Sequence, residues 1–67
     1  MKKGDIVEVA RGLKYVQERF EGKAGELVGC GILLGENKPS WELYFHKANY
    51  TQFVYEDDLK VLEKAPD

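Results

Sequence analysis

The chain has 67 residues, which suffices for one small domain. Its single cysteine, Cys30, excludes a disulfide within the chain, and one cysteine with one histidine does not supply the four ligands of a structural zinc site. A hydrophobic content of 43% with 12% aromatic residues can supply a packed core, which argues against a disordered chain. Stability must therefore come from that core or from self-association, and homo-oligomers stay open.

The formal net charge is −2, and this acidic balance argues against general nucleic-acid binding. The charge is uneven, because residues 1–23 hold six basic and four acidic side chains, whereas residues 24–67 hold four basic and eight acidic ones. A dipolar surface of this kind would orient an approaching partner more than it would tighten binding. A solvated surface with a chance asymmetry is the alternative interpretation.

The sequence shows no segment suited to a membrane or to secretion. No apolar stretch of signal-peptide length follows the basic N-terminus, and the longest apolar run, Ile32-Leu33-Leu34, is far too short to cross a bilayer. One free cysteine suits a reducing compartment. We therefore predict a cytoplasmic protein without membrane insertion.

The first strand is expected at residues 6–9, where the alternation puts Val7 and Val9 on one face. Residues 13–23 follow as a long, partly ordered loop that carries aromatic side chains. The spacing of apolar residues in this loop also allows one or two helical turns, so a short helix is the alternative.

The second strand is expected at residues 25–34. Glycines weaken a strand unless it bends, and closing a small barrel requires such bends. We therefore expect Gly29 or Gly31 at a bulge or bend, with Cys30 as a small buried residue between them.

The second half of the chain shows regular strand and turn signals. Residues 41–46 alternate as a half-buried strand, and Asn49 suits the left-handed conformation of a tight turn. The expected elements are a polar turn at 35–40, strands at 41–46 and 50–55 joined by a turn at 47–49, a 3₁₀ turn at 56–59 and a closing strand at 60–63.

Five short strands with one long early loop predict an all-β fold, a small five-stranded SH3-like barrel spanning residues 1–63. Residues 64–67 are expected to be a disordered tail. The expected core comprises Val7, Val9, Leu27, Ile32, Leu43, Phe45, Phe53, Leu59 and Val61, with Trp41 at one mouth of the barrel.

The segment around the third turn resembles a strand-turn-strand of photosystem I reaction-centre subunit IV. The matching pattern is Phe45-x-Lys47-x-Asn49-Tyr50-Thr51. The same region, with Arg19-Phe20-Glu21-Gly22 upstream, is also similar to subunit S of the cyanobacterial NAD(P)H-quinone oxidoreductase.

Both families are SH3-like accessory proteins of electron transport that help to dock ferredoxin. The resemblance covers about two-thirds of the chain and implies an SH3-like barrel with an acidic redox protein as partner. A second, broader likeness is to nucleic-acid-binding modules of the KOW type. It rests on Lys3-Gly4-Asp5-x-Val7-x-Val9 and Lys23-Ala24-Gly25.

No group of residues commits the chain to a reaction. His46 has no nucleophile or orienting partner placed by the sequence, so we interpret it as a solvated strand residue. The run Glu56-Asp57-Asp58 does not have the ligand spacing of a calcium loop, and free N–H groups at a 3₁₀ turn explain it without a metal. We therefore expect no enzyme activity, no cofactor and no metal site.

The most favoured function is a small non-catalytic accessory module that docks on another protein. Its long loop combines positive charge with an aromatic residue, and loops on a rigid scaffold carry function. The candidate partner-binding residues are Arg11, Lys14, Tyr15, Arg19, Tyr44 and His46. The alternatives are a KOW-like nucleic-acid-binding module and a very small oligomeric SH3-like enzyme.

Overall fold

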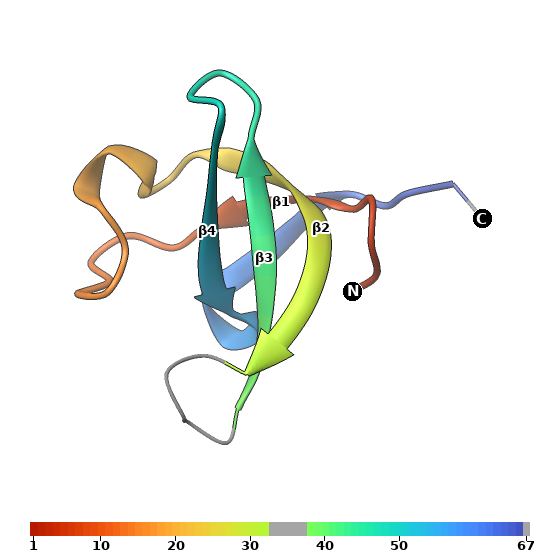
Figure 1. Cartoon of the computed structure of the whole chain (residues 1–67), viewed down its shortest axis with the longest axis horizontal. Coiled ribbons are helices and arrows are strands. Elements are labelled where there is room, and N and C mark those ends of the chain that lie inside the picture. The colour runs from red at the N-terminus through yellow and green to blue at the C-terminus, as the bar shows by residue number, and fades with distance from the viewer. Residues whose placement is uncertain (33–37, 67) are drawn as a thin grey trace.

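The computed structural model describes residues 1–32 and 38–66, with side chains at 31 and 32 left out. These residues are all-β, with five strands in one antiparallel sheet and two 3₁₀ turns (Figure 1). The elements in chain order are β1 (Ile6–Val9), η1 (Glu18–Phe20), β2 (Ala24–Ile32), β3 (Pro39–Phe45), β4 (Tyr50–Tyr55), η2 (Glu56–Asp58) and β5 (Leu59–Glu63). The five strands and the 3₁₀ turn before the last one are therefore confirmed.

The sheet curls strongly. Its strand order is β4-β3-β2-β1-β5, so β4 and β5 are opposite edges, although only the three residues of η2 separate them in the chain. In a flat sheet, these edges would lie about 19 Å apart. The connection from the end of β4 to the start of β5 spans at most about 14 Å. The edges must therefore approach each other, and Figure 1 shows β1 and β5 crossing behind β3 and β4.

Strand β2 changes partner along its length. It pairs with β1 from Ala24 to Glu26 and with β3 from Glu26 onward. Its register on β3 shifts between Leu27 and Gly29, which confirms the expectation of an irregularity at Gly29. The expected end of this strand at residues 33–34 and the first half of the turn at 35–40 lie outside the described residues. The last two residues expected in that turn, Pro39 and Ser40, belong to β3 instead.

Gly25 of β2 lies close to the end of β3. A Cβ atom there would come within 3.3 Å of the Tyr44 carbonyl oxygen and of the Phe45 ring. Both contacts are tighter than ordinary van der Waals packing. The lack of a side chain at this position thus lets the two strands meet over the core.

Most of the expected core is confirmed. The buried apolar side chains are Val7, Val9, Val16, Phe20, Leu27, Leu43, Phe45 and Val54. Leu59, Val61 and Trp41 are partly buried and pack against this cluster. The side chain of Ile32 lies outside the described part of the structure.

Two expectations about burial are wrong. Phe53 is 39% exposed, because it pairs with Glu42 on the outer face of β3 while the next residue, Val54, faces the core. Cys30 is exposed rather than buried, because the corner at which it was expected to be covered comes earlier, between Leu27 and Gly29.

The long loop, residues 10–23, contains the single turn η1 and has no α-helix. It contributes two core residues, Val16 and Phe20. Its end is fixed to β1, because the Gly22 N–H donates to the Val9 carbonyl at 2.8 Å and the Val9 N–H donates to the Lys23 carbonyl at 3.0 Å. The loop is therefore a packed part of the fold.

Asp5 joins the two ends of the described chain. Its side chain is 3% exposed, and its carboxylate accepts hydrogen bonds from the Ala65 N–H at 2.7 Å and the Lys2 N–H at 3.0 Å. These two backbone donors, Ala65 first, lower the pKa of Asp5 below its ordinary value of 3.8.

We expect the Asp5→Asn variant to be less stable than the wild type at pH 7 and nearly equal to it at pH 2. The bonded carboxylate stabilises the fold above the unfolded-state pKa, and this contribution is lost as the pH falls through the lower folded-state pKa. Urea unfolding of both proteins at the two pH values measures the difference. A gap of the same size at both would contradict the role of the ionised carboxylate.

Candidate docking pocket

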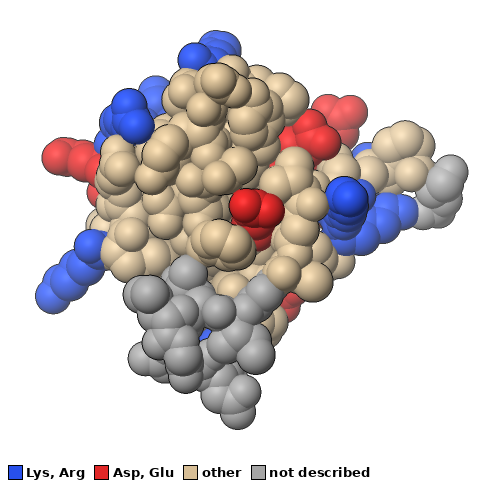
Figure 2. All heavy atoms as spheres, viewed as in Figure 1, with Lys and Arg blue, Asp and Glu red and all other residues tan. Residues whose placement is uncertain are grey.

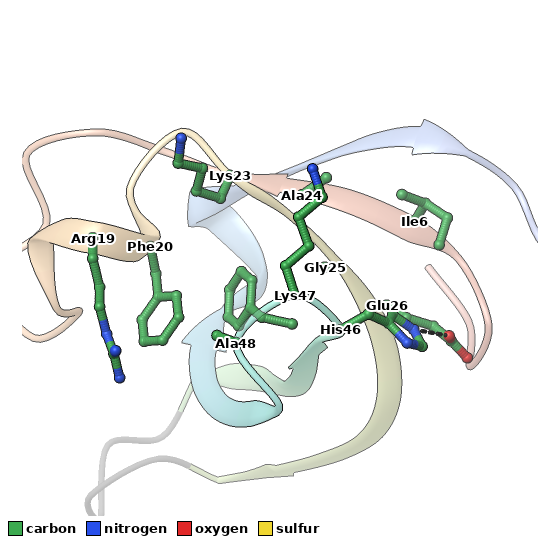
Figure 3. Close-up of a pocket in the computed structure, with 11 residues that line it drawn as sticks. Ile6, Arg19, Phe20, Lys23, Ala24, Gly25, Glu26, His46, Lys47 and Ala48 are labelled. Carbon is green, nitrogen blue, oxygen red and sulfur yellow. Dashed lines mark hydrogen bonds and ion pairs between the residues drawn. The ribbon is translucent and has the colours of Figure 1, made fainter.

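A pocket of about 520 Å³ opens between η1, the first residues of β2 and the β3–β4 turn (Figure 3). Its apolar lining comes from Ile6, Phe20, Ala24, Phe45 and Ala48. Its charged lining comes from Arg19, Lys23, Glu26 and Lys47, with His46 beside them. An apolar surface with a few polar groups around it is the usual composition of a binding site.

A stack of three aromatic rings supports the pocket. The Phe20 ring stacks on Phe45 with centroids 4.5 Å apart and an interplanar angle of 20°. It also stacks on Tyr50, with centroids 5.2 Å apart and an angle of 13°. Through this stack, the long loop is held against the β3–β4 hairpin, so the two sides of the pocket are joined by buried contacts.

Arg19 is positioned before any partner arrives. Its guanidinium carbon lies 4.6 Å from the Phe20 ring centroid and 5.5 Å from that of Tyr50, a cation–π arrangement. Its Nε–H donates to Gln17 Oε1 at 2.9 Å. The Nη groups are not part of that bond, so they can donate to a partner's carboxylate, at a reduced entropic cost.

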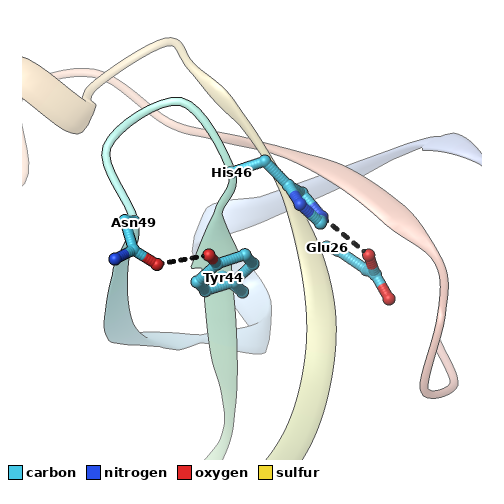
Figure 4. Close-up of polar contacts among 4 residues, drawn as sticks. All are labelled: Glu26, Tyr44, His46 and Asn49. Carbon is cyan, nitrogen blue, oxygen red and sulfur yellow. Dashed lines mark hydrogen bonds and ion pairs between the residues drawn. The ribbon is translucent and has the colours of Figure 1, made fainter.

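The charges around the pocket are unbalanced. Within the described residues, the ammonium groups of Lys23 and Lys47 have no hydrogen-bond or ion-pair partner. The single acid of the lining, Glu26, already interacts with His46, whose Nε2 lies 2.8 Å from Glu26 Oε1 (Figure 4). The pocket is thus a positive site in a chain whose net charge is −2.

The β3–β4 turn that carries Lys47 is held by local contacts. Asn49 adopts a φ of 51°, which confirms the expected left-handed residue. The Tyr44 hydroxyl donates to Asn49 Oδ1 at 2.5 Å, and the Tyr44 ring meets His46 edge-on at 4.6 Å (Figure 4). Tyr44 therefore supports the turn from the outer face of β3.

The residues proposed from the sequence are divided between the pocket and its surroundings. Arg19 and His46 line the pocket, and Tyr44 contacts His46. Arg11 and Lys14 are exposed on the long loop outside the lining.

Tyr15 lies apart from the pocket, against the end of β4. Its hydroxyl donates to Asp58 Oδ2 at 2.6 Å and accepts from the Tyr55 N–H at 3.1 Å. Burial, and then the bond to Asp58, raise the pKa of the Tyr15 hydroxyl. These contacts give Tyr15 a role in the fold.

Sequence reasoning missed Lys23, Lys47 and Phe20 as parts of a site. Lys47 falls inside the pattern that resembles the photosystem subunit, so a signal for it was present. Phe20 and Lys23 also fall inside quoted patterns, Arg19-Phe20-Glu21-Gly22 and Lys23-Ala24-Gly25, but neither pattern places them beside the β3–β4 turn. In the space-filling view, basic side chains stand around the β3–β4 turn and along the long loop (Figure 2).

The described residues contain no cluster of three or more potential metal ligands among His, Cys, Asp and Glu. Nor do they form a helix with the length and hydropathy needed to cross a membrane. No family model, curated protein or solved structure matches the chain.

Proposed function

We propose that this chain is a small non-catalytic module that docks on an acidic protein through the pocket between η1 and the β3–β4 turn. The observation that carries the proposal is a ring of three cations, Arg19, Lys23 and Lys47, around an apolar floor in an acidic chain. Complementary charge orients and speeds the approach of a partner, and apolar contact then holds it.

We further propose that the curled sheet is an SH3-like barrel. Support comes from the sheet order, from the short η2 connection between the two edges, and from the change of partner along β2. Small barrels bind ligands at their loops and strand ends, and this pocket lies at such a place.

The resemblance to electron-transport accessory subunits suggests the class of partner, an acidic redox protein such as a ferredoxin. Surface charges are screened by salt, with a Debye length of about 8 Å at physiological ionic strength. Docking that depends on the three cations should therefore weaken as salt rises.

The test compares immobilised wild-type protein with two double variants in a capture experiment from lysate of the native host. Lys23→Glu with Lys47→Glu reverses two cations of the pocket. Lys60→Glu with Lys64→Glu changes the net charge equally, at exposed positions outside the pocket.

We expect the wild type and the Lys60/Lys64 variant to retain the same acidic proteins at low salt and to release them as salt rises. The Lys23/Lys47 variant should lose them. Equal retention by both variants, or equal loss from both, would refute the pocket as the docking face.

A further inference from the structure

We infer that the pocket takes one apolar side chain of the partner, carried in a segment with acidic residues on both sides of it. This inference rests on the proposed function and adds the chemistry of the anchor to it. Two features carry it, the shape of the apolar floor and the directions of the cations.

The floor is preformed and has room for a side chain. Phe20 and Phe45 are 3% and 4% exposed and are stacked on each other, so their positions are fixed by packing. The other wall is made by small residues, Ala24, Gly25 and Ala48. Aromatic surface facing small residues leaves space for an apolar group, and a volume of about 520 Å³ is in the range of ligand pockets.

The cations extend in different directions from this floor. In the view of Figure 3, Arg19 extends downward beside Phe20, whereas Lys23 and Lys47 extend upward. A ligand with a single carboxylate could pair with the cations on one side of the pocket only. A peptide with carboxylates before and after its apolar anchor can pair with Arg19 and with the two lysines at the same time.

The overall charge favours a short acidic segment over a larger polyanion. A nucleic acid or an anionic membrane would extend beyond the pocket and meet the rest of a chain that is acidic overall. An acidic protein segment places its charge within the pocket alone. We therefore assign the site to a peptide segment.

The probe is a fluorescein-labelled peptide of six glutamates with one phenylalanine at its centre, titrated with purified protein and followed by fluorescence anisotropy at low salt. The control peptide has serine in place of phenylalanine. We expect the phenylalanine peptide to bind roughly 10-fold or more tightly, as burial of one aromatic side chain predicts.

Two variants fill the pocket without changing its charge. Ala24 and Ala48 are both exposed, on β2 and on the β3–β4 turn, so tryptophan can be introduced at either without entering the core. For Ala24→Trp and Ala48→Trp, each checked for a wild-type melting curve, we expect the preference for the phenylalanine peptide to vanish while weak binding of the serine peptide remains.

The charge variants separate this inference from the function on which it rests. Lys23→Glu with Lys47→Glu should weaken both peptides, and Lys60→Glu with Lys64→Glu should weaken neither. Equal binding of the two peptides to the wild type, or binding of neither, would overturn the apolar anchor. The proposed docking function would still stand if capture of acidic proteins depended on Lys23 and Lys47.

Discussion

Replacing Phe20 with alanine is expected to cost about 3–5 kcal/mol of unfolding free energy, the usual range for a buried phenylalanine. At typical values per residue, a domain of this length has a total stability of only about 3–10 kcal/mol. The Phe20→Ala variant should therefore lose about a third or more of its stability and melt at a clearly lower temperature. Urea unfolding at low temperature, followed by circular dichroism, measures the loss.

The effect is large because Phe20 joins two parts of the molecule. Its ring stacks on both Phe45 and Tyr50, and the Arg19 guanidinium lies over it. Without the ring, the long loop loses its aromatic stacking on the β3–β4 hairpin, and a cavity opens beside Phe45. The pocket would then lose its floor together with the packing that positions Arg19.

Phe53→Ala is the matched control, because it removes the same ring from a residue that is 39% exposed. We expect it to cost less than about 1 kcal/mol, as for most exposed substitutions. Equal losses in the two variants, or a larger loss for Phe53→Ala, would contradict the assignment of Phe20 to the core.

The same pair of residues shows where the sequence could not decide. Residues 50–55 are rich in aromatic and β-branched side chains and do not alternate clearly, so either face could have been the buried one. The register with β3 selects Val54, which pairs with Trp41, and turns Phe53 outward. Register depends on pairing with another strand, and the local pattern does not contain it.

The long loop posed a related difficulty. Its apolar residues are spaced as in a helix, but only one 3₁₀ turn forms, and Phe20 is buried by residues more than twenty positions later in the chain. By contrast, β1 and the end of β3 alternate cleanly, and their buried residues were predicted correctly. The local alternation of apolar residues predicted which strand residues are buried. The packing of the long loop depends on contacts with distant residues, which the local pattern does not contain.

The candidate site follows the same division. Arg19 and His46 were predicted from charge and residue type, and both line the pocket. Lys23 joins them because it directly precedes β2, whose first residues lie beside the end of β3 through the pair Glu26 and Tyr44. The pocket combines residues from the long loop, the start of β2 and the β3–β4 turn, so the pattern within one segment does not predict it.

Tyr15→Phe is expected to destabilise the protein by about 1–3 kcal/mol, the cost of leaving partly buried hydrogen-bonding groups unpaired. The hydroxyl serves both Asp58 and the Tyr55 N–H, and the Tyr15 ring meets Tyr55 edge-on at 5.1 Å. Tyr44→Phe is the control and should cost much less, because among the described residues the Tyr44 hydroxyl bonds only to the exposed Asn49.

The pH dependence of this effect has a definite sign. The folded state raises the pKa of Tyr15 above its ordinary value of 10.0, so the stabilising contribution is complete below that pH and is lost as the pH rises above it. The gap in unfolding free energy between wild type and Tyr15→Phe should therefore narrow between pH 9 and pH 11, while binding of the phenylalanine peptide at neutral pH should be unchanged. Weaker peptide binding by Tyr15→Phe, with stability intact, would instead make Tyr15 a direct contact of the partner and move the docking surface toward the end of β4.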